Sequence, residues 1–88
     1  MRLDKFLKIS CIFSTRSSAE KAIIQGNIIL NEQKTKPSTN VKIGDYLIVI
    51  FPFKKVNYQI LKLSEKNVSK KEAKDMVKII SEEKIEFY

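Results

Sequence analysis

The side chains best suited to bind a charged ligand are a few basic residues in the first quarter of this chain. Arg2 and Arg16 are its only arginines, whereas the other 15 of its 17 basic residues are lysines. A guanidinium can grip a phosphate through two parallel hydrogen bonds, which a lysine ammonium cannot do. Arg2, Lys5 and Lys8 advance in steps of three, and Arg16 and Lys21 follow closely. This spacing predicts one basic surface for a polyanion.

The neighbouring residues add a second reason to expect phosphate binding at Arg16. It lies close to the expected start of a helix, where unpaired backbone amides already favour an anion. An ordinary solvated basic surface remains the alternative interpretation, because a charge pattern alone does not distinguish the two.

No residue pattern predicts an enzyme, a metal site or a cofactor. The chain has no histidine, and Cys11 is its single cysteine, so a nucleophile with its base and a zinc ligand set are both missing. Asp4 and Lys8 have the i,i+4 spacing of a helical ion pair. Only two glycines are present, which excludes a glycine-rich phosphate loop. We therefore expect a binding protein that is not an enzyme.

Composition predicts a small domain of the cytoplasm. The 88 residues are 43% hydrophobic and carry a net charge of +7, which favours a folded core and a polyanionic partner. A single cysteine fits a reducing compartment. The start of the chain has no apolar signal region, and the longest apolar run, 46–53, is too short to span a membrane. We expect no membrane partner.

The periodicity of apolar residues predicts an α+β fold: two N-terminal helices packed on a small antiparallel sheet, followed by a C-terminal helix. The first helix covers residues 2–10, and the second ends at Gly26 after a start that Ser14, Thr15 or Ser17 could cap. Strands are expected at 27–30, 46–51 and 56–60. A C-terminal helix capped by Ser69 would place four apolar side chains on one face: Ala73, Met76, Val77 and Ile80.

Several stretches together resemble the alpha-L RNA-binding motif, the domain named after small-subunit ribosomal protein S-four. They are Met1-Arg2-Leu3-Asp4-Lys5-Phe6-Leu7, Arg16-Ser17-Ser18-Ala19, Gly26-Asn27-Ile28-Ile29-Leu30-Asn31, Lys36-Pro37-Ser38 and Val41-Lys42-Ile43-Gly44-Asp45. This resemblance implies a single RNA-binding domain over residues 1–88. It would consist of an alpha-L core at 1–62 and a helical extension at 63–88.

Over its whole length the chain resembles the ribosome-associated quality-control factors of this family and small heat-shock RNA-binding proteins. This implies binding to large-subunit rRNA and P-site tRNA of stalled ribosomes, and support of alanine tailing by an RqcH-like partner protein. The residues implied in RNA binding are Arg2, Lys5, Lys8, Arg16, Lys21 and Lys36. A free RNA-binding regulator, or a rescue protein without tailing, is the alternative.

The chain departs from the family pattern in the turn between the two helices. Cys11, Ser14 and Thr15 stand where basic residues are common, and Asn31-Glu32 replaces an Asn-Gly turn. Fewer phosphate contacts imply weaker RNA binding with a flatter salt dependence. A protein-interaction surface on the C-terminal apolar face is a further alternative, although core packing explains that face as well.

Overall fold

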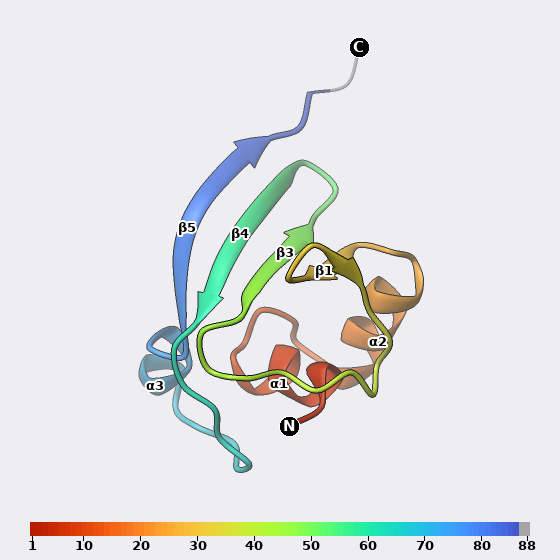
Figure 1. Cartoon of the computed structure of the whole chain (residues 1–88). Coiled ribbons are helices and arrows are strands. Elements are labelled where there is room, and N and C mark those ends of the chain that lie inside the picture. The colour runs from red at the N-terminus through yellow and green to blue at the C-terminus, as the bar shows by residue number, and fades with distance from the viewer. Residues whose placement is uncertain (87–88) are drawn as a thin grey trace.

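The computed structural model describes residues 1–86. It contains two N-terminal helices, an antiparallel sheet and a short third helix (Figure 1). The five strands are ordered β2-β1-β3-β4-β5, and every neighbouring pair is antiparallel. The α+β prediction is confirmed. In chain order the elements are α1 Leu3–Ile9, α2 Arg16–Ile24, β1 Ile28–Leu30, β2 Gln33–Lys34, β3 Tyr46–Ile50, β4 Lys54–Ile60, α3 Lys70–Lys74 and β5 Val77–Lys84.

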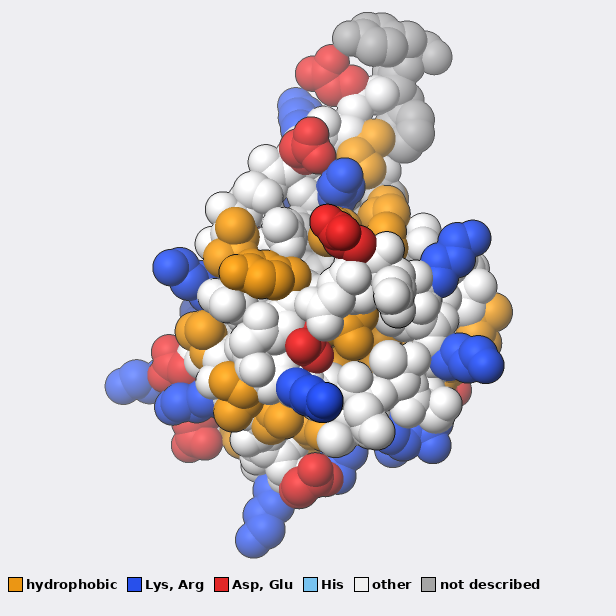
Figure 2. All heavy atoms as spheres, viewed as in Figure 1, with side chains coloured by type: hydrophobic (Ala, Val, Ile, Leu, Met, Phe, Trp, Pro, Cys, Tyr) orange, Lys and Arg blue, Asp and Glu red, His pale blue; other side chains and the backbone are white. Residues whose placement is uncertain are grey.

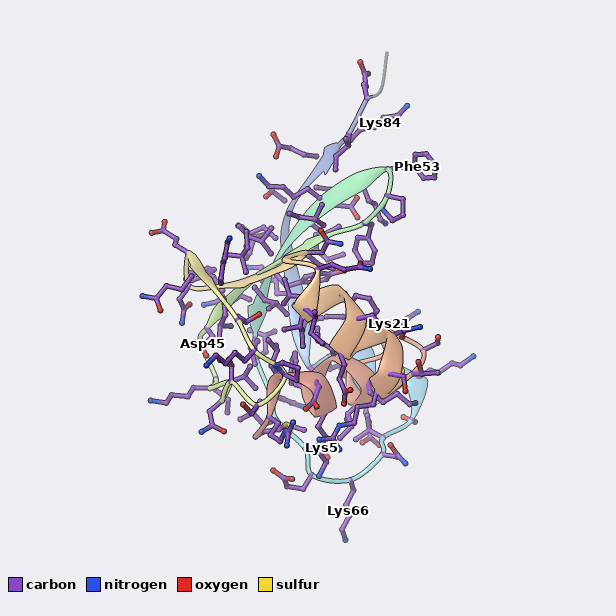
Figure 3. The ribbon with its side chains drawn as sticks, turned by 90° about the vertical axis from the view of Figure 1, so that its right-hand side faces the viewer. Lys5, Lys21, Asp45, Phe53, Lys66 and Lys84 are labelled. Carbon is purple, nitrogen blue, oxygen red and sulfur yellow. The ribbon has the colours of Figure 1, made fainter. Side chains whose placement is uncertain are left out.

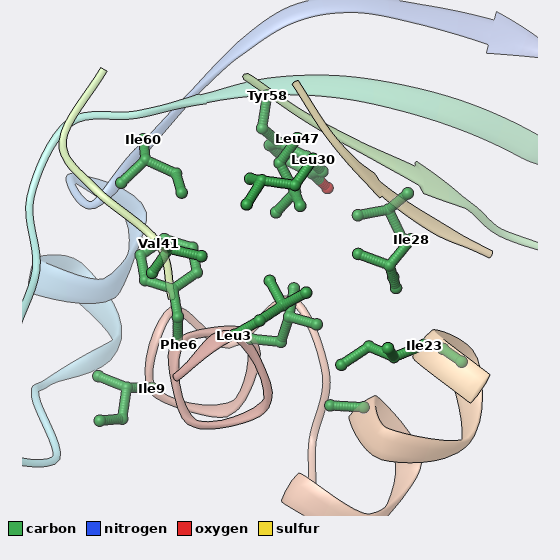
Figure 4. Close-up of a cluster of buried hydrophobic side chains, with 14 of the residues drawn as sticks. Leu3, Phe6, Ile9, Ile23, Ile28, Leu30, Val41, Leu47, Tyr58 and Ile60 are labelled. Carbon is green, nitrogen blue, oxygen red and sulfur yellow. The ribbon is translucent and has the colours of Figure 1, made fainter. Parts of the chain in front are cut away.

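The core lies between the two N-terminal helices and one face of the sheet. Leu3 and Phe6 of α1 and Ile23 of α2 point into the space between the helices and the strands (Figure 4). From the sheet, alternate residues of β3 and β4 such as Leu47 and Val56 are fully buried. Alternation arises because successive side chains of a strand point to opposite faces. The helices therefore keep a fixed position on the sheet.

Each of the two N-terminal helices is followed by a residue in the left-handed conformation. After α2, Gly26 has φ +81°, and the Gly26 and Asn27 amides donate to carbonyls of the last turn. After α1, Cys11 takes the same role with φ +62°. Thr15 settles the start of α2, since its hydroxyl accepts from the Ser18 amide at 3.0 Å. Arg16 is consequently the first residue of that helix.

A loop over residues 35–45 runs along the start of α1 and carries Lys36 to that end of the molecule. The Leu3 amide donates to the Thr39 carbonyl at 2.7 Å, and the Val41 amide donates to the Met1 carbonyl at 2.9 Å. These bonds fix the first residues of the chain, so the backbone of Arg2 is held on both sides.

The prediction of a C-terminal helix through Ile80 was wrong beyond Lys74. Ser69 does cap α3 at the Glu72 amide, but the helix has five residues and β5 follows it. β5 pairs with β4 from Lys54 to Ile60, so residues 77–84 belong to the sheet and only residues 70–74 are helical in the C-terminal part. Three β-branched residues within Val77–Ile80 favour a strand, and the open edge of β4 supplies its partner.

Charged side chains are spread around the molecule. In the view of Figure 2, lysine and arginine side chains project at several places on the outline, with acidic side chains among them. The net charge of +7 is therefore not gathered into one patch on that face. Within residues 1–86, no helix has the length and apolar content needed to cross a membrane.

Candidate nucleic-acid interface

Arg2 and Arg16 meet at a single buried carboxylate, that of Asp4. Arg16 Nη2 donates to Asp4 Oδ1 and Arg16 Nε lies by Oδ2, each at 3.2 Å, so the contact is bidentate. Arg2 Nη2 donates to Oδ2, also at 3.2 Å. Arg2 Nη2 and Arg16 Nε both lie 3.2 Å from Asp4 Oδ2, so these two nitrogens are separated by at most twice that distance.

The environment of Asp4 keeps it ionised. Burial on its own raises the pKa of this carboxyl, whose side chain is 0% exposed. The hydrogen bonds from Arg16 and from the Lys5 amide, at 2.8 Å, lower the pKa, as do the charges of Arg16 and Arg2. The lowering effects prevail, so the Asp4 pKa lies below its usual value of 3.8. Its negative charge then cancels one of the two guanidinium charges.

The arginine pair is anchored but still accessible. The side chains of Arg2 and Arg16 are 50% and 46% exposed, while Asp4 beneath them is covered. Each guanidinium has five N–H donors, and Asp4 accepts only some of them. The partners of Asp4 differ from the sequence expectation, which matched it with Lys8. The arrangement provides two guanidinium groups of fixed position with a net charge of about +1 for the three side chains.

Lys5 is also paired with a carboxylate, but at the surface. Its Nζ lies 2.8 Å from Glu65 Oε2, in the loop between β4 and α3. The hydrogen bond and charge of Lys5 lower the pKa of Glu65, burial raises it slightly, and the N-terminal amine lowers it further. Glu65 is 72% exposed, so water competes with this pair. Figure 3 shows Lys5 and Lys66 at the same end of the molecule.

The other three predicted RNA-binding residues have no ion pair within residues 1–86. Lys36 is exposed on the loop beside α1, and its amide donates to Thr39 Oγ1 at 2.9 Å. Lys8 lies in the last turn of α1. Lys21 projects from the middle of α2, away from Lys5 (Figure 3). The structure thus brings Arg2 and Arg16 together at Asp4, with Lys5 next in the chain, whereas Lys21 lies elsewhere on the surface (Figure 3).

Asp4 and Glu65 are the two site residues that sequence reasoning missed. Helical spacing suggested Lys8 as the partner of Asp4, but its partners lie two and twelve positions away. Glu65 is 60 positions from Lys5, and no local pattern reports such a pair. Among residues 1–86, no three His, Cys, Asp or Glu side chains are grouped so that they could hold a metal ion.

Comparison with known proteins gives the class and then the family. Residues 1–46 match the S4 domain, which includes α1, α2 and the arginine pair, so this is an S4 domain protein. The chain is 43% identical over 84 residues to the RQC P-site tRNA stabilizing factor of Listeria monocytogenes serovar 1/2a, covering 96% of this chain and 90% of that protein. The factor of Bacillus subtilis (strain 168) is 42% identical over 97% of this chain and 98% of its own.

A solved structure supports the same assignment. Heat shock protein 15 of Vibrio cholerae, described as trimeric, matches with a TM-score of 0.86 and 28% identity, covering 92% of this chain and 82% of that one. The chain belongs to the family of RQC P-site tRNA stabilizing factors.

Proposed function

We propose that this protein is a cytoplasmic RNA-binding factor of ribosome-associated quality control that performs no catalysis itself. The observation that carries this proposal is family membership along almost the full length of the chain. The match to the S4 domain over residues 1–46 supports RNA binding by the N-terminal half. The P-site tRNA named for its relatives is the tRNA that we assign to this protein.

In finer terms, the protein binds large-subunit rRNA and the P-site tRNA of a stalled complex. It stabilises that tRNA while an RqcH-like partner adds a C-terminal alanine tail to the nascent chain. The RNA contacts that we assign are Arg2, Lys5, Lys8, Arg16, Lys21 and Lys36.

The arginine pair is the proposed centre of this interface. Arg2 and Arg16 direct their free N–H donors to phosphate oxygens, since bidentate, charge-assisted hydrogen bonds are the strongest that a side chain offers to phosphate. Asp4 acts as a positioning residue, because it holds both guanidinium groups before RNA arrives. A pre-formed arrangement avoids the cost of ordering long side chains on binding.

The turn between α1 and α2 limits the strength of the interface. Cys11 and Ser14 are exposed there and carry no charge. Each missing cation removes one phosphate contact and lowers the slope of log affinity against log salt by about 0.7–0.9. We therefore expect a flatter salt dependence than for a relative with basic residues in this turn.

Co-sedimentation with purified large ribosomal subunits tests the proposal. We expect the protein in the large-subunit fraction at low salt, and loss of most of that binding in the Arg2→Ala, Arg16→Ala double variant. Lys84→Ala, at the far end of β5 (Figure 3), is the control that keeps binding. Absence from the large-subunit fraction at low salt would reject the ribosomal role.

A second variant guards against misfolding. Alanine at both arginines leaves the buried Asp4 carboxylate without its cations, which could destabilise the fold. Arg2→Lys with Arg16→Lys keeps the charge but removes the bidentate geometry. We expect this variant to fold and still bind ribosomes more weakly. Full binding by it would mean that charge alone, and not guanidinium geometry, makes the contact.

The alternative is a regulator or rescue protein that binds RNA without supporting tailing. Crosslinking and sequencing of bound RNA separates the two functions, because rRNA and tRNA should dominate for a quality-control factor. Predominance of messenger RNA would favour the free regulator.

A further inference from the structure

A surface groove of the molecule is lined by none of the residues of the arginine site, Arg2, Asp4 and Arg16. It has a volume of about 620 Å³ and is bounded by the turn after α1, by α3 and by the inner face of β4 and β5. We call it the C-terminal groove. The lining residues that matter here are Cys11, Ile12, Lys70, Lys74, Val77 and Ile79.

The groove combines an aliphatic floor with a basic rim. Ile79 is 55% exposed in the groove, and Ile12 and Val77 lie beside it. Lys70 and Lys74 are exposed on α3, and neither forms an ion pair within residues 1–86. None of the described residues that line the groove is acidic. An occupant that complements this surface is acidic and also presents aliphatic side chains.

The strand that borders the groove is open on one side. β5 is at the end of the sheet and has only β4 as a neighbour within residues 1–86, although it is eight residues long. Such an edge exposes a row of backbone amides and carbonyls that can pair with one more strand. Lys78, on the opposite face of β5 from Ile79, is exposed and also without an ion pair there.

We propose that the C-terminal groove binds an extended acidic peptide segment of a partner protein, with aliphatic residues at alternate positions. The segment pairs with the free edge of β5, as in β-strand addition, where main-chain hydrogen bonds give affinity and side-chain pockets give specificity. Its aliphatic side chains cover Val77 and Ile79. Its acidic side chains meet the lysines at the rim.

The floor fits a peptide better than RNA. Single-stranded RNA is held by bases stacked on exposed aromatic rings. Among residues 1–86, the one aromatic side chain that lines this groove is Tyr58, which is 9% exposed and therefore offers no open ring face. The neighbouring rings of Phe13 and Phe51 already stack on each other, with centroids 6.2 Å apart. A nucleotide base would therefore gain little stacking energy on this aliphatic floor.

Binding of a designed peptide to the full-length protein tests the proposal. The probe is a fluorescein-labelled peptide of alternating Glu and Val, about eight residues long to match β5. We expect fluorescence anisotropy to detect binding at low salt, and Lys70→Glu with Lys74→Glu to weaken it about tenfold. Lys71→Glu is the matched control, because Lys71 lies on α3 outside the groove.

Two neighbouring isoleucines give a second matched pair. Ile79→Asp should weaken peptide binding, whereas Ile80→Asp should not, since Ile80 is exposed to a similar degree but does not line the groove. Hydrogen exchange of the β5 amides should slow when the peptide binds, because strand pairing buries them. A peptide of alternating Lys and Val should not bind.

Three results would overturn the proposal. The first is no binding of the acidic peptide, and the second is an equal loss with Lys71→Glu or Ile80→Asp. The third is that Lys70→Glu with Lys74→Glu weakens binding of an oligouridine but not of the peptide, which would make the groove an RNA contact. The Arg2 and Arg16 variants should bind the peptide normally, so this test is independent of the RNA-binding proposal.

Discussion

Two carboxylates in this protein hold proposed RNA-binding cations, and they do so in opposite environments. Asp4 is completely buried and binds Arg2 and Arg16, whereas Glu65 is 72% exposed and binds Lys5. The pKa of both acids lies below its usual value, and in both cases the cation contributes to that change. The chemistry is the same, but the surroundings differ.

This difference implies different roles for the two acids. A buried carboxylate with two cations and a backbone amide as partners has few alternatives, so it fixes the arginines in place. An exposed ion pair competes with water and salt and contributes little to stability. We therefore expect a phosphate to displace Glu65 from Lys5 easily. At the arginines, the phosphate would bind the remaining N–H donors while Asp4 stays hydrogen-bonded to both guanidinium groups. Asp4 positions cations, and Glu65 only screens one.

The largest expected effect is on stability after Asp4→Asn. We expect the free energy of unfolding to fall by about 2 kcal/mol. This is less than for a fully buried ion pair, because the half-exposed arginines regain water. Glu65→Gln, the matched control, should leave stability unchanged. Urea denaturation followed by circular dichroism measures both variants, and similar values would remove the distinction between the two acids.

The next effect is a pH dependence of the free energy of unfolding. We expect Asp4 to supply nearly all of it, because Glu65 is 72% exposed. A carboxyl whose pKa is lower in the folded than in the unfolded chain stabilises the fold above its unfolded pKa. That contribution is lost as the pH falls from about the usual 3.8 through the lowered pKa of Asp4. Wild-type stability should thus decline in this acidic range, and Asp4→Asn should decline less. Parallel curves for the two proteins would contradict the role of Asp4.

The fold could be predicted from sequence wherever local patterns determine it. Apolar spacing located α1 and α2, and alternation located β4, because these faces pack on one core. β5 was missed because Ala73, Met76, Val77 and Ile80 fit a helical period. Pairing with β4, a contact between distant parts of the chain, decides the strand.

The same limit applies to the candidate site. The types and positions of Arg2 and Arg16 marked them as a pair, and the structure brings them to one carboxylate. Asp4 was assigned to Lys8 because short-range spacing is the only pairing signal in a single sequence. Glu32 also illustrates the limit, since its φ of +69° in the β1–β2 turn is the geometry that an Asn-Gly sequence would supply at lower cost.

Removing the charge of Asp4 and removing the charge of Glu65 should change the affinity for ribosomes in opposite directions. Asp4→Asn raises the net charge, yet we expect about two- to tenfold weaker binding to large subunits, because the arginines lose their fixed positions. Glu65→Gln also raises the charge but should strengthen binding at low salt. It frees Lys5, so the log–log salt slope should steepen by about 0.7–0.9. Stronger binding by both variants would show that charge outweighs positioning.

The smallest expected effect is the response of each acid to salt. At about 1 M salt the screening length is near 3 Å, which weakens exposed ion pairs much more than buried ones. The pKa of Glu65 should therefore rise back toward its usual value as salt is added, while the pKa of Asp4 stays lowered. NMR titration of the two carboxyl carbons at low and high salt measures this. In Lys5→Met, the Glu65 pKa should already be closer to its usual value at low salt, and the Asp4 pKa should not follow it. If both pKa values returned together, the arginine pair would be as open to water as Lys5, and Asp4 could not act as its anchor.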